Sequence, residues 1–111
     1  MTIDERPKAV ALVRRDIPVS VVDLYALAER HGYRLVFTVF TDAGPNVTAL
    51  ALARHAGEHD AAAIVVPGFE HVDAIRHLVT DNAALITPIR LYPRGHRWPG
   101  NITERERQVD G

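Results

Sequence analysis

With 111 residues, the chain has room for one domain around one hydrophobic core. A hydrophobic fraction of 47% and a charged fraction of 24% exclude a largely disordered chain, and a formal net charge of -1 excludes a global basic field for nucleic acids. The absence of cysteine excludes disulfides, thiolate zinc sites and thiol catalysis. The first residues are too polar for a signal peptide, and no apolar run approaches the ~20 residues of a membrane span. We therefore expect a cytoplasmic protein without membrane contacts.

The first predicted elements are a strand and a helix. Residues 8–13 (KAVALV) form an apolar run that is typical of a strand buried on both faces of a parallel sheet. Ser20 is the expected N-cap of the following helix, with Asp23 three residues later as its capping-box partner. This helix is predicted to run to about His31 and to end at Gly32.

The middle of the chain predicts a strand, a helix and another strand. Residues 33–40 (YRLVFTVF) are rich in aromatic and β-branched side chains, which favours a second strand. Asn46 is the expected cap of an alanine-rich helix over about residues 47–57. Residues 61–66 (AAAIVV) then predict a third buried strand, which Pro67 ends.

The last predicted elements complete the fold class. A third helix is expected over about residues 70–80, and a fourth strand over residues 84–89, where Pro88 indicates an edge position or a strand end. Strands that alternate with helices through short connections predict a three-layer α/β fold. We expect a four-stranded parallel sheet in the order 2-1-3-4, with the first helix on one face and the next two on the other.

One domain is expected over residues 1–90, followed by a basic and aromatic tail over residues 91–111 that is partly disordered. Prolines and glycines interrupt any helical or strand pattern in this tail. Tyr92 and Trp98 are expected to dock it on the domain. Alternatively, the stretch contacts a nucleic-acid backbone, through Arg90, Arg94, Arg97 and Trp98.

Polar side chains gather in the loops at the carboxyl ends of the predicted strands, where open α/β sheets bind ligands. The acids among them either supply hard oxygen ligands for Mg²⁺, or lie in solvent, or pair with the neighbouring arginines. One histidine, His71, is a candidate for chemistry because of its place at this edge. The candidate ligand-binding edge consists of Arg14, Arg15, Asp16, Asp42, Glu70 and His71.

The pattern resembles the catalytic domain of the serine recombinases, the resolvases and invertases, over about residues 8–90. In that family the first strand ends in a tyrosine-x-arginine-x-serine motif. Here Arg14 matches the arginine, and Asp16 stands in the place of the serine. The family's glycine-aromatic-x-leucine/valine step into the second strand matches residues 32–36 (GYRLV), and its acidic residue in the next loop is kept as Asp42.

The resemblance implies the family's fold without its reaction. Of the arginines that would hold a scissile phosphate, only Arg14 remains, because Glu70, His71 and Ala74 stand where the family has an aspartate and two arginines. An aspartate at position 16 cannot replace the serine alkoxide and repels an incoming phosphate. We therefore expect no catalytic residues, no metal and no cofactor.

The sequence thus predicts a non-catalytic, recombinase-like domain that acts as a regulatory or protein-interaction module. Two alternatives stay open: a DNA-associated accessory protein that uses the basic stretch, and a small enzyme or ligand-binding protein with an acidic site at the sheet edge. We expect a protein partner or self-association, because residues 33–40 form a long apolar edge that the tail or a second copy should cover.

Overall fold

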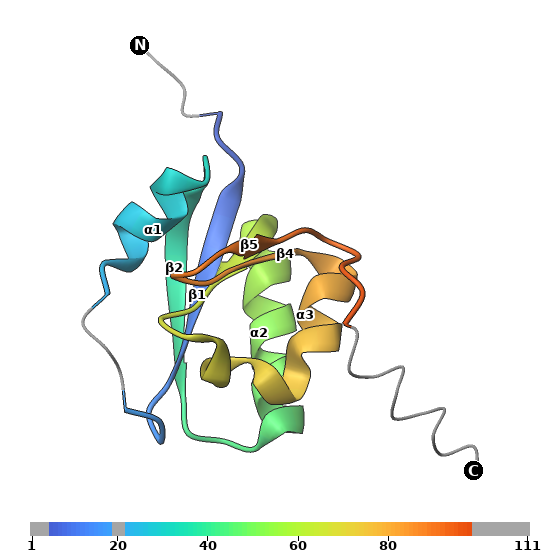
Figure 1. Cartoon of the computed structure of the whole chain (residues 1–111). Helices are drawn as coiled ribbons and strands as arrows, with labels where there is room; N and C mark the ends of the chain where they lie inside the picture. The colour runs from blue at the N-terminus through green and yellow to red at the C-terminus, as the bar shows by residue number, and fades with distance from the viewer. Residues whose placement is uncertain (1–4, 19–21, 99–111) are drawn as a thin grey trace.

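The computed structural model describes residues 5–18 and 22–98, which fold around a five-stranded sheet (Figure 1). The strands are β1 (Lys8–Arg14), β2 (Arg34–Thr41), β3 (Ala61–Val65), β4 (Ala84–Ile86) and β5 (Leu91–Tyr92). Their order is β2-β1-β3-β4-β5; neighbours among the first four are parallel, and β5 runs antiparallel to β4. The predicted α/β class is confirmed, but the prediction of a wholly parallel sheet of four strands is wrong, because the antiparallel β5 is a fifth strand.

Helices cover both faces of this sheet. The α-helices of the described residues are α1 (Leu24–Arg30), α2 (Pro45–His59) and α3 (Arg76–Asn82). Helix α1 lies on one face, and α2 and α3 lie on the other (Figure 1). The alternation along β1 fits this division, because Ala9 and Ala11 belong to the core under α1, whereas Val10 and Leu12 belong to the core under α2 and α3. Within the described ranges, no helix is long and apolar enough to span a membrane.

The start of α1 differs from the prediction. The helix begins at Leu24, and its N-cap is Asp23, whose carboxylate accepts a hydrogen bond from the backbone N–H of Ala26 at 3.1 Å. An aspartate is as good a cap as a serine, because either side chain can accept a bond from the free N–H groups of the first turn. Ser20, the predicted cap, lies outside the described residues, and the position of the cap belongs to Asp23.

The start of α2 also lies earlier than predicted. Gly44 is the N-cap and Pro45 is the first helical residue, a position where proline loses no helical hydrogen bond. Asn46, the expected cap, is therefore inside the first turn. At the other end, Asp60 adopts the left-handed conformation with φ 55°, and its N–H bonds to the last turn of the helix.

The predicted third helix over residues 70–80 is wrong in its first half. Two 3₁₀ turns, Phe69–His71 and Asp73–Ile75, precede α3. Val72 and Ile75 both have φ near -122°, far from the helical value, and both side chains are buried. Tertiary burial of two β-branched side chains thus overrides the helical spacing that the sequence shows here.

The predicted fourth strand ends early, and a fifth strand follows it. The hydroxyl of Thr87 accepts hydrogen bonds from the N–H groups of Ile89 and Arg90 at 3.3 and 3.1 Å, which closes a tight turn around Pro88. The chain then returns as β5, in which Tyr92 pairs with Leu85 of β4. The expectation that no strand follows residue 90 is therefore wrong.

Tyr92 and Trp98 dock the segment after β5, as expected. The indole N–H of Trp98 donates a hydrogen bond to the hydroxyl of the buried Thr80 at 3.0 Å. The Trp98 ring also lies 4.8 Å from the ring of Tyr92 and 5.5 Å from that of Phe69, between centroids. Residues 93–98 consequently pack on α3 and the first 3₁₀ turn.

Candidate functional site

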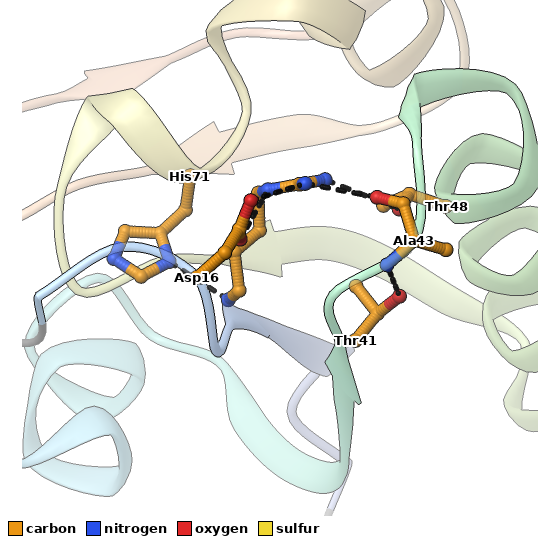
Figure 2. A network of polar contacts seen from close by, with 6 residues as sticks. Asp16, Thr41, Ala43, Thr48 and His71 are labelled. Carbon is orange, nitrogen blue, oxygen red and sulfur yellow. Dashed lines mark hydrogen bonds and ion pairs between the residues drawn. The ribbon is translucent and has the colours of Figure 1, made fainter.

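The carboxyl ends of β1 and β2 meet in a polar network centred on Arg14, the last residue of β1 (Figure 2). Its guanidinium donates two hydrogen bonds to the carboxylate of Asp16, at 3.1 Å from Nε and 3.0 Å from Nη2. It also donates to the hydroxyl of Thr48 at 3.2 Å and to the carbonyl of Ala43 at 2.8 Å. One side chain therefore ties the end of β1 to the β2–α2 loop and to the first turn of α2.

Asp16 holds Arg14 in the forked geometry with which an arginine binds an oxyanion. The two groups form an ion pair at 3.0 Å, with the Arg14 side chain 15% exposed and that of Asp16 49% exposed. The hydrogen bonds from Arg14 hold the pKa of the Asp16 carboxyl below its ordinary value. The position that a phosphate or carboxylate ligand would occupy on Arg14 is thus taken by the chain's own carboxylate.

His71 supports the same residue from the backbone side. The Nδ1 atom of His71 accepts a hydrogen bond from the backbone N–H of Arg14 at 2.9 Å. The neutral ring must therefore carry its proton on Nε2. His71 is buried with 2% exposure, and this burial lowers the pKa of its imidazole. The geometry makes His71 an acceptor for the main chain, with Nδ1 unavailable as a proton acceptor for a substrate.

The β2–α2 loop and the first turn of α2 each contribute one partner that the sequence did not predict. The carbonyl of Ala43 accepts bonds from both Arg14 and the hydroxyl of Thr48, the latter at 3.2 Å. The loop is itself held by Thr41, whose hydroxyl accepts a bond from the N–H of Ala43 at 3.0 Å. A backbone carbonyl carries no residue-specific signal, and Thr48 could be expected at this edge only once α2 was known to begin at Pro45.

The other predicted residues of this edge do not join the network. The guanidinium carbon of Arg15 lies 5.6 Å from the ring centroid of Phe40, and Asp42 and Glu70 are exposed. Within the described part of the chain, no three or more histidine, aspartate or glutamate side chains are grouped to hold a metal ion. The structure thus brings together Arg14, Asp16 and His71 and leaves the remaining three apart.

The predicted nucleic-acid contacts lie away from this network, beside β5. Trp98 is engaged with the rings of the docked segment and with Thr80. The guanidinium carbon of Arg90 lies 4.5 Å from the centroid of Tyr92, and Arg94 and Arg97 are exposed. Trp98 therefore serves the packing of the domain, which opposes the use of its ring as a stacking platform for bases.

Two apolar features of the described surface are a groove and an open sheet edge. The groove, of about 710 Å³, lies between α2 and α3 and includes the exposed Leu50 and Leu78. The open edge is β2, which pairs only with β1 among the described strands. Its Phe37 and Phe40 are 37% and 55% exposed.

Backbone groups on the open edge have no hydrogen-bond partner among the described residues. The carbonyl of Thr41 accepts a bond from Arg15 N–H, so Thr41 directs its backbone toward β1. In a strand, successive residues direct these groups to opposite sides. The N–H and C=O groups of Thr38 and Phe40 therefore point to the open edge. At the start of the strand, the N–H of Arg34 bonds to the Pro7 carbonyl on the β1 side, so the groups of the next residue, Leu35, also point to the open edge.

No family model, curated protein or solved structure matches this chain.

Proposed function

We propose that this chain is a non-catalytic protein-interaction module that binds an extended segment of polypeptide along β2. The observation that carries the proposal is the open edge of this strand. Its outward N–H and C=O groups are complementary to any strand laid beside it, and Phe37 and Phe40 add exposed apolar surface on the two faces. Strand addition to an exposed sheet edge is a recurring mode of peptide recognition.

The composition of β2 supports this use. Edge strands that avoid pairing are usually short, carry charges or contain proline. Strand β2 spans eight residues (RLVFTVFT), has no proline, and carries its only charge at Arg34, where it begins. One protective device is present, a bulge at Val36, which leaves the run from Phe37 to Thr41 regular.

The network around Arg14 supports the non-catalytic part of the proposal. In the serine recombinases, which the sequence resembles, the matching arginine would face a phosphate. Here its guanidinium is engaged by Asp16, Thr48 and Ala43. In that resemblance, the carboxylate of Asp16 stands in the position of the nucleophile and engages the arginine that would otherwise bind the phosphate.

The test uses a peptide of the same length as β2, made of alternating threonine and valine, flanked by lysines and labelled with a fluorophore. We expect saturable binding by fluorescence polarisation. Thr38→Pro removes an outward N–H and no hydrogen bond to β1, so it should weaken binding about tenfold or more while the domain stays folded. As a matched control, the peptide with every second amide methylated should not bind. Equal binding of the methylated peptide would contradict the proposal, as would failure of β2 to bind any strand, whether the peptide or a second copy of the chain.

A further inference from the structure

We infer that the strand that β2 binds is β2 of a second copy of this chain, antiparallel to it, about a two-fold axis through Thr38. The two sheets would join into one continuous sheet. This inference rests on the proposed function, because it names the partner for the same edge. Three independent properties of β2 point to a second copy: its backbone pattern, its side chains and its charges.

The backbone pattern of β2 is self-complementary about Thr38. Leu35, Thr38 and Phe40 direct their N–H and C=O groups outward, and Val36 is the extra residue of the bulge between Leu35 and Phe37. With the bulge counted as one position, Leu35 and Phe40 lie equally far from Thr38. An antiparallel pair centred on Thr38 therefore sets outward groups opposite outward groups along its whole length, Thr38 against Thr38 and Phe40 against Leu35.

The side chains match in the same register. On the α1 face, Leu35, Thr38 and Phe40 line a shallow depression of about 460 Å³ together with the exposed Tyr25. The pairing sets Phe40 of one copy beside Leu35 of the other and covers this depression with apolar surface. Residues directly opposite each other in antiparallel strands are close enough for such aromatic and aliphatic contacts.

The opposite face and the strand ends are complementary too. On the α2 face, Phe37 stacks on His55 and His59 at 4.6 and 5.1 Å, and the register places it opposite Val39 of the second copy. Arg34 begins the strand and Asp42 follows its end. Antiparallel pairing brings Arg34 of each copy near Asp42 of the other, whereas parallel pairing would bring like charges together.

The other edge of the sheet cannot take this role. Strand β5 has only two residues, so pairing of β2 with β5 of a neighbour would give a short contact that repeats without closing. A two-fold β2 pair closes on itself and leaves β5 outside. The assembly expected is therefore a dimer.

The first experiment places a single cysteine at the proposed axis. The chain contains no cysteine, so Thr38→Cys gives a protein in which any disulfide is between copies. Facing Cα atoms of a hydrogen-bonded antiparallel pair lie ~5.5 Å apart, within the range a disulfide spans. We expect a covalent dimer under mild oxidation. Leu50→Cys, at an exposed position in the α2–α3 groove, is the matched control and should stay monomeric.

The second experiment is a charge exchange at the same position. Thr38→Lys and Thr38→Glu each place like charges opposite each other across the axis, and each should weaken the dimer about tenfold or more in light scattering. Mixing the two variants should restore it. Rescue on mixing would show that position 38 faces position 38, which a merely destabilised monomer would not produce.

The outcomes separate the inference from the proposed function. If the chain is a monomer at all concentrations but still binds the threonine–valine peptide, the inference that the partner is a second copy is wrong, and the proposed strand binding is retained. Failure of both dimer and peptide binding overturns the proposed function. A disulfide from Leu50→Cys, with none from Thr38→Cys, places the interface in the groove and overturns the inference.

Discussion

Arg14 and His71 illustrate how much structure two residues can fix. The Arg14 side chain bridges β1, the β2–α2 loop and α2, and its backbone N–H donates to His71 on the first 3₁₀ turn. Three segments far apart in the sequence thus meet through one residue. The bond is partly buried and its acceptor His71 is buried, so losing the acceptor would leave the Arg14 N–H without a partner, which costs more than the bond itself contributes.

Replacing His71 with phenylalanine tests this role. The phenyl ring keeps most of the volume but offers no acceptor to Arg14 N–H, so we expect the free energy of unfolding to fall by about 1–3 kcal/mol. Urea denaturation measures the difference. His71→Asn, whose carbonyl can accept the bond, is the matched control and should lose less. Equal stability of the phenylalanine variant and the parent would show that the bond contributes little.

The pH dependence of stability should report the same residue. Burial lowers the pKa of folded His71 below its ordinary value of about 6.5, so the unfolded chain binds the proton more readily. The contribution of neutral His71 is therefore fully present above about pH 6.5 and is lost as the pH falls from there through the lowered folded pKa. The parent should lose more stability than His71→Phe over that interval. Asp16, whose pKa is also lowered, acts in a separate and more acidic window, below about pH 4.

The docked segment after β5 depends on Trp98. Its ring packs on Tyr92 and Phe69, and its indole N–H bonds to Thr80. Because Trp98 is only partly buried, Trp98→Ala should lower the free energy of unfolding by about 2 kcal/mol. Truncation of a fully buried aromatic side chain lowers it by ~3–5 kcal/mol. Trp98→Phe loses mainly the hydrogen bond from the indole N–H to Thr80, and it should lower the free energy of unfolding by about 1 kcal/mol.

Limited proteolysis measures, in the same variants, how often the docked segment detaches from the domain. Arg94 and Arg97 are trypsin sites within the docked segment, and undocking should expose them. Cleavage there should be faster in Trp98→Ala than in Trp98→Phe or the parent. Cleavage at one rate in all three proteins would mean that the segment stays docked without the indole.

The elements that the sequence predicts well are those with the strongest local pattern. The apolar runs around β1 and β3 were found within one or two residues, because each strand is buried on both faces. The two-residue β5 was missed because its pairing depends on the Thr87 turn rather than on its own composition. The helical spacing over residues 70–80 predicts one continuous helix, which does not form because Val72 and Ile75 are buried in the core in a non-helical conformation.

The candidate site was predictable to the same degree. The rule that parallel strands end at one edge predicts that Arg14, Asp16 and His71 lie near one another. It does not predict which side chains bond, and Asp42 and Glu70 point to solvent although they share the edge. Arg14 and Asp16 are only two residues apart, so their pairing could be anticipated from the sequence. The contacts of Arg14 with the Ala43 carbonyl and with Thr48 depend on the path of the β2–α2 loop, which the sequence does not predict.

The two sides of the sheet are built differently. The core under α1 is rich in alanine, with Ala9, Ala11, Ala28, Ala63 and Ala84 all buried. The core under α2 and α3 consists mainly of valine, leucine and isoleucine. Small side chains let the short α1 lie close to the sheet, whereas α2 and α3 leave an open groove between them.

This asymmetry predicts that the same substitution destabilises one side of the sheet and is nearly neutral on the other. Ala11→Leu adds volume under α1, where Ala11 has 0% exposure, and should lower the free energy of unfolding by about 1–3 kcal/mol. Ala53→Leu adds the same atoms at an exposed position in the α2–α3 groove and should change it by less than about 0.5 kcal/mol. Urea denaturation of both variants and the parent measures the contrast. A costly Ala53→Leu would mean that the groove is filled in solution, and a neutral Ala11→Leu would mean that α1 can move away from the sheet without penalty.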